Sequence, residues 1–78
     1  MSSFEYKVGK KFLIQKSEST ELSIRISSID IITMDKREYS LGVFIFLKGD
    51  KEKIKLVCSD REQVEEIYRA LMEKLEED

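Results

Sequence analysis

Apolar and polar residues alternate in short runs through the first three-quarters of the chain, and this alternation is typical of half-buried β-strands. Leu22, Ile24 and Ile26 form one such run, with a polar residue at each position between them. Turn signals such as Gly9 and Gly49 separate the runs. The pattern predicts four to six strands, over residues 4–8, 11–16, 21–26, 29–34, 39–48 and 52–58.

Ser27 and Ser28 interrupt the alternation between the strands expected at 21–26 and 29–34. The interruption indicates a change in the direction of the backbone. A single bent strand with a β-bulge and two separate short strands fit this pattern equally well.

From Ser59 onward the spacing of apolar residues changes from two to about 3.6, which is the period of an α-helix. Ser59 with Glu62 matches a capping box, and Asp60 with Gln63 matches an alternative box one residue later. We therefore predict a helix over residues 60–76. Its apolar stripe comprises Val64, Ile67, Tyr68, Leu71, Met72 and Leu75.

These elements predict a single α+β domain over residues 1–78, in which a bent antiparallel sheet of four to six strands is closed by one C-terminal helix. The apolar stripe of the helix needs an apolar sheet face to pack against. We expect that face to carry Phe12, Ile14, Ile24, Ile54 and Leu56.

The strand expected at 39–48 is apolar on both faces, because an unbroken apolar run from Val43 to Leu47 lies within it; the run begins with Val43, Phe44, Ile45 and Phe46. Either Phe44 and Phe46 or Val43 and Ile45 must therefore face away from the helix. The sheet then either curls into a barrel around this second face or is covered by another chain. These four residues are our candidates for an interface.

Residues 38–75 resemble the C-terminal part of pleckstrin-homology-like domains. In that family a strand such as Tyr39–Leu47 turns into a strand such as Lys53–Cys58, and a short polar segment leads to a helix with an aromatic near its middle, here Tyr68. The stretch ELSIRISSIDIITM is similar to the family's strand that ends in an Ile-x-x-Ile element. The resemblance implies a shortened fold of this kind that serves as a binding scaffold, without naming a ligand.

The composition narrows the classes of function. The net charge is −2, which gives no general indication of nucleic-acid or membrane binding. With Cys58 as the only cysteine and no histidine, the chain has no intramolecular disulfide and none of the usual zinc or transition-metal ligand sets. The sequence shows no signal peptide and no apolar run long enough to span a membrane. We expect a cytoplasmic protein without metal or cofactor.

Four lysines surround the Gly9 turn: Lys7, Lys10, Lys11 and Lys16. Phosphoinositide binding in the family named above uses basic residues in the corresponding region, so the resemblance implies that these lysines are candidates for binding an anionic ligand. Lysines that only keep a small sheet soluble explain the same pattern.

Catalysis has little support, since the chain lacks histidine and a glycine-rich phosphate loop. Nucleic-acid binding is disfavoured because Phe44 and Phe46 do not alternate with lysines in the sequence. Cys58 precedes the helix, where a thiolate is stabilised, but its alternation with Ile54 and Leu56 places it in the core.

We expect a non-enzymatic protein-interaction module that self-associates as a homodimer or larger assembly, or binds another protein. One alternative is a protein that binds or sequesters a small anionic ligand, such as a nucleotide or a phosphoinositide headgroup. Another is a small inhibitor of a host protein.

Overall fold

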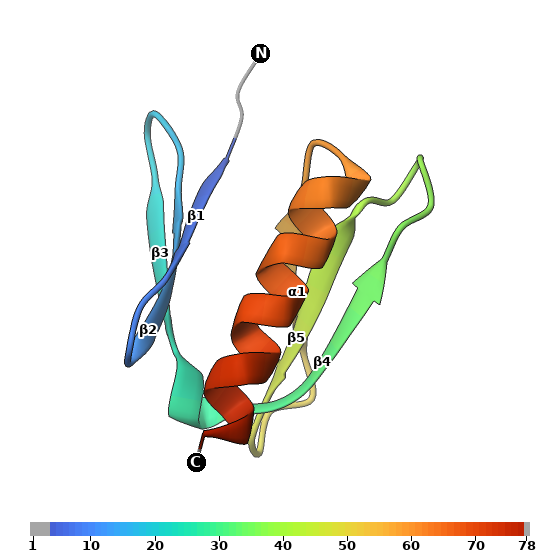
Figure 1. The fold of residues 1–78 in the computed structure, drawn as a ribbon. Helices are drawn as coiled ribbons and strands as arrows, with labels where there is room; N and C mark the ends of the chain where they lie inside the picture. Colours follow the sequence, from blue (N-terminus) through green and yellow to red (C-terminus); the bar gives the residue numbers. More distant parts are fainter. Residues whose placement is uncertain (1–3, 78) are drawn as a thin grey trace.

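The computed structural model describes residues 4–77, which form two three-stranded antiparallel sheets and one C-terminal helix (Figure 1). The first sheet has the order β1-β2-β3 and the second the order β4-β5-β6. The predicted α+β class is confirmed, with the strands divided between two sheets. The elements are β1 (Glu5–Val8), β2 (Phe12–Lys16), β3 (Glu21–Arg25), β4 (Ile29–Asp35), β5 (Gly42–Leu47), β6 (Lys53–Val57) and α1 (Arg61–Glu76).

One turn of 3₁₀-helix, η1 (Ile26–Ser28), separates β3 from β4, so the interrupted stretch forms two strands. Backbone hydrogen bonds tie this turn to both sheets. Ile26 N donates to Lys11 O at 2.8 Å, and Lys48 N donates to Ser28 O at 2.9 Å. The register of β4 against β5 also shifts between Ile29 and Ile31, so a bulge follows the turn.

The helix begins with the later of the two predicted capping boxes. Asp60 is the N-cap residue, and its carboxylate accepts a hydrogen bond from Gln63 N at 2.8 Å. The Gln63 side chain reaches back and accepts from Ser59 N at 2.8 Å. The first contact satisfies a backbone donor that the first turn leaves without a partner, and the second satisfies the Ser59 amide just before the helix.

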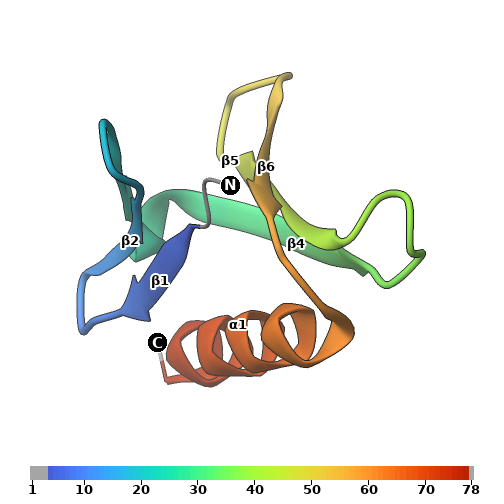
Figure 2. The same cartoon turned by 90° about the horizontal axis from the view of Figure 1, so that it is seen from above.

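The helix lies over the opening between the two sheets, as the view in Figure 2 shows. It contacts β1 on one side and β4 and β5 on the other. The core therefore sits where three layers meet, with Leu13 from the first sheet, Ile45 from the second and Leu71 from the helix all fully buried. The other buried apolar residues are Ile24, Ile26, Ile29, Val43, Leu56, Cys58, Val64 and Ile67.

The sequence prediction that Phe12 and Ile14 form the inward face of β2 was wrong. Leu13 is fully buried, whereas Phe12 is 38% exposed and Ile14 is only half-buried. Leu13 pairs directly with Ile24, and residues that pair directly across two strands lie on the same face. Because β2 is apolar at three successive positions, its own alternation does not determine which face it buries. The register with β3 does.

On β6 the expected inward face is the observed one. Leu56 is fully buried and Ile54 is half-buried beside it. Within residues 4–77 no helix has both the length and the apolar character required to cross a bilayer.

Candidate binding surfaces

The side of the second sheet that faces away from α1, here called the outer face, carries two of the four residues proposed for an interface. Val43 and Ile45 are fully buried against the helix, and Phe44 and Phe46 alternate with them on the opposite side. Pairing across β4 and β5 places Ile31 beside Phe46 and Thr33 beside Phe44. The outer face therefore has an aromatic and aliphatic centre.

The residues around this centre are open to solvent. Ile31 is 52% exposed, and Val57 is 46% exposed on β6 at the same side of the sheet. Phe44 and Phe46 are half-buried. The strands of the described residues form two separate three-stranded sheets, so no barrel closes around these side chains, and α1 packs on the opposite, inner side. Within residues 4–77, the exposed apolar surface of the outer face is therefore supplied mainly by Ile31 and Val57.

Lysines of β6 border the phenylalanines, in contrast to the expectation from the sequence. Lys53 Nζ lies 4.7 Å and Lys55 Nζ 5.5 Å from the centre of the Phe44 ring. These distances fit cation–π contacts. The cause is the hairpin register, which pairs Phe44 with Lys55 and Phe46 with Lys53. A linear alternation of aromatic and basic residues is therefore not required to bring them together.

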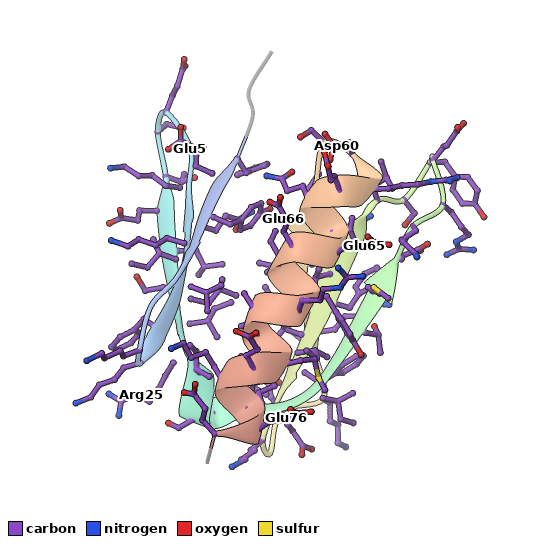
Figure 3. All side chains as sticks on the ribbon, viewed as in Figure 1. Glu5, Arg25, Asp60, Glu65, Glu66 and Glu76 are labelled. Carbon is purple, nitrogen blue, oxygen red and sulfur yellow. The ribbon has the colours of Figure 1, made fainter. Side chains whose placement is uncertain are left out.

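A second candidate surface is a cavity of about 450 Å³, here called the basic pocket. It opens where the β1–β2 turn, η1 and the C-terminal end of α1 converge. Figure 3 shows Arg25 at this end of the molecule, where α1 finishes near Glu76. The lining residues are Lys10, Lys11, Phe12, Arg25, Ile26, Ser27, Lys74 and Glu77.

The four lysines proposed from the sequence divide between different parts of the structure. Lys10 and Lys11 line the basic pocket. Lys7 lies within β1 and does not line it, and Lys16 lies at the opposite end of β2 from the pocket. The structure thus brings two of the four together.

Arg25 and Lys74 complete the cationic lining, and the sequence reasoning missed both. Arg25 pairs with Phe12 across β3 and β2, and its guanidinium carbon lies 5.5 Å from the centre of the Phe12 ring. Lys74 arrives from the last turn of α1. The proximity of Arg25 to the Gly9 turn depends on the register between β2 and β3. No local feature of the sequence indicates that Lys74 lies near that turn.

The charges of the pocket are mostly uncompensated. Among the described residues, the ion pairs include Lys74 with Glu77 at 3.9 Å and none with Lys10, Lys11 or Arg25. The lining therefore combines four cationic side chains with one carboxylate over an apolar floor of Phe12 and Ile26. Such a site attracts anions.

Cys58 lies in the core, with 7% of its surface exposed. Its Sγ donates a weak hydrogen bond to Leu56 O at 3.6 Å. Burial is the main reason that the pKa of this thiol rises from 9.0 to about 11, and Asp60 adds to the rise. A protonated, buried thiol is a poor nucleophile. Residues 4–77 also contain no group of three or more His, Cys, Asp or Glu side chains arranged to hold a metal ion.

The comparisons with known proteins assign no family. No protein-family model, no curated protein and no solved structure matches the chain. The chain is a small α+β domain whose C-terminal helix packs on two three-stranded antiparallel sheets.

Proposed function

We propose that the protein is a non-enzymatic interaction module that self-associates through the outer face of the second sheet. The observation that carries this proposal is the exposed apolar surface of that face, where Ile31 is 52% exposed beside the half-buried Phe46. Contiguous exposed apolar surface of this kind marks interaction sites in soluble proteins. A chain of 78 residues also has a small core, so burial at an interface adds usefully to its stability.

The charges at the two edges of the sheet favour a second copy of the chain as the partner. The β4 edge carries the exposed Asp30, and the β6 edge carries Lys53 and Lys55. A two-fold axis parallel to the strands would place β6 of one copy over β4 of the other. The lysines of β6 would then lie over the strand that carries Asp30, and the exposed apolar residues of both copies would meet.

The resemblance of residues 38–75 to pleckstrin-homology-like domains supports the same class of function. We include a shortened fold of that kind in the proposal, with six strands where such domains usually have seven. A scaffold of this type presents surfaces for binding, which agrees with a role in protein association.

The test is the mass of the assembled protein in solution, measured by native mass spectrometry and by light scattering across a concentration series. We expect the wild-type chain to form a dimer or larger assembly and the double variant Ile31→Ser/Phe46→Ser to be monomeric. Leu22→Ser is the matched control, because Leu22 is a 39% exposed apolar residue on the first sheet. Its mass should equal that of the wild type.

Circular dichroism of each variant establishes that it is folded. A wild-type chain that stays monomeric throughout the series contradicts the proposal. A folded double variant that remains assembled contradicts it equally.

A further inference from the structure

We infer that the basic pocket binds a small phosphorylated molecule whose apolar or aromatic part lies against Phe12 and Ile26. This inference does not depend on self-association, because the pocket shares none of its lining residues with the outer face of the second sheet. Its basis is the combination of several convergent cations, an apolar floor and a fixed backbone at one end of the fold.

The cations come from three separate elements and converge on one cavity. Lys10 and Lys11 extend from the β1–β2 turn, Arg25 from the end of β3, and Lys74 from α1. Lysine supplies a compact ammonium group, and arginine supplies a planar fork that matches two oxygens of a phosphate. A phosphate or diphosphate group has enough oxygens and charge to contact several of these donors together.

The apolar floor distinguishes this site from a surface cluster of lysines. Among the lining residues, Phe12 is 38% exposed and Ile26 is 3% exposed, so Phe12 provides most of the accessible apolar surface. The Arg25 guanidinium lies against the Phe12 ring, which limits its freedom before a ligand arrives. A base, a ring or another apolar group attached to the phosphate would cover the exposed part of Phe12 and gain from its burial.

The backbone of the pocket is held in place by hydrogen bonds. Gly9 N donates to Phe12 O at 2.9 Å and closes the turn that carries the two lysines. Ile26 N donates to Lys11 O at 2.8 Å and fixes that turn to η1. A fixed backbone lowers the conformational entropy that binding would otherwise cost.

Two features of the pocket oppose the binding of an anion, and both are weaker than the features that favour binding. The C-terminal end of α1 carries partial negative charge, and Glu77 adds a carboxylate. Glu77 is 68% exposed and is already near Lys74, so solvent and a counter-charge screen it. Four cations against one carboxylate leave the pocket attractive to a doubly charged phosphate. The cavity of about 450 Å³ lies within the range of small-molecule sites.

The experiment measures binding of three probes to the full chain. Adenosine diphosphate and inorganic pyrophosphate are titrated by calorimetry, and vesicles that contain phosphatidylinositol 4-phosphate are tested by co-sedimentation. Tighter binding of the nucleotide than of pyrophosphate supports a soluble ligand with an apolar part. Binding to the vesicles alone supports a lipid headgroup as the source of the same phosphate chemistry.

Matched variants test whether the pocket is responsible. Lys10→Gln/Lys11→Gln and, separately, Arg25→Gln should each weaken binding of the active probe about tenfold. Lys7→Gln/Lys16→Gln removes the same charge from the same sheet outside the pocket and should leave the affinity within about twofold. Glu77→Gln should strengthen binding, because it removes the opposing carboxylate.

Two results would overturn the inference. One is the absence of binding for all three probes. The other is an equal loss of affinity in the pocket variant and in the Lys7→Gln/Lys16→Gln control, because that would indicate a non-specific response to charge. All substituted side chains are on the surface, and circular dichroism verifies that each variant keeps its fold.

Discussion

At the scale of single residues, Tyr6 connects the two sheets. Its hydroxyl donates to the Val57 carbonyl of β6 and accepts a hydrogen bond from Gln15 Nε2 at 3.0 Å. Partial burial raises the pKa of Tyr6 from 10.0 to about 12. The neutral hydroxyl therefore stabilises the folded state fully below pH 10, and this contribution is lost as the pH rises from 10 to 12.

Tyr6→Phe tests this connection. The variant loses the hydrogen bond between the sheets, so we expect its free energy of unfolding at neutral pH to fall by about 1 kcal/mol. It should also lose less stability than the wild type between pH 10 and 12, since the ionising hydroxyl is gone. Urea denaturation at several pH values measures both effects. Tyr39→Phe is the control, because Tyr39 is 79% exposed and its hydroxyl accepts a hydrogen bond only from the exposed Arg37, so both quantities should stay close to those of the wild type.

Cys58 gives a second prediction at this scale. Its thiol is buried, and its raised pKa of about 11 keeps it protonated at neutral pH. We expect an aromatic disulfide reagent to modify it only in the fraction of molecules that is unfolded. The rate should therefore rise with urea in parallel with the fraction of unfolded protein. Rapid, complete modification of the native protein would show instead that the thiol is accessible.

At the scale of elements, Gly42 allows β5 and β6 to approach closely. A Cβ atom at this position would lie 2.7 Å from Leu56 O and 3.1 Å from Lys55 Cε. The first contact is with backbone, which moves only if the strand pair moves. We expect Gly42→Ala to lower the free energy of unfolding by about 1–3 kcal/mol.

Gly9→Ala is the matched control for this substitution. A Cβ at Gly9 would meet only Phe12 O, at 3.4 Å, which is an ordinary contact. Its stability in chemical denaturation should therefore stay close to that of the wild type. Equal effects of the two substitutions would mean that the close approach at Gly42 does not limit the strand pair.

The order and type of these elements follow from local patterns that the sequence contains. The helix was predictable because its apolar stripe and its capping residues Asp60 and Gln63 agree with each other. The choice between Phe12 and Leu13 as the buried residue of β2 was not predictable from β2 itself. It depends on pairing with Ile24 in another strand, and this register is a tertiary property.

The candidate surfaces were predictable only where local sequence supplies them. Lys10 and Lys11 are neighbours in one turn, and the phenylalanines of β5 occupy one apolar run. The contact of Lys55 with Phe44 arises from the hairpin register. Lys74 joins the basic pocket because the last turn of α1 packs near the β1–β2 turn and η1. Contacts between distant elements of this kind have no signature in a single sequence.

At the scale of the whole molecule, the two proposed surfaces lie on different parts of the fold. The basic pocket is built from the β1–β2 turn, η1 and the end of α1, which gather at one end of the molecule in Figure 1. The apolar centre of the outer face lies on β4 and β5, on the side away from α1. The two surfaces can therefore act independently.

Independence of this kind predicts a specific pattern across the variants. Ile31→Ser/Phe46→Ser should lose the assembled mass and keep the affinity of the pocket for its probe, because none of its substitutions is in the pocket lining. Lys10→Gln/Lys11→Gln should bind the probe more weakly and keep the assembled mass of the wild type. A variant that carries all four substitutions should be monomeric and should also bind the probe weakly, since sites without shared contacts contribute additively. If the monomeric variant instead binds the probe much more weakly, assembly itself shapes the pocket, and the ligand then stabilises the assembled form by the same free energy.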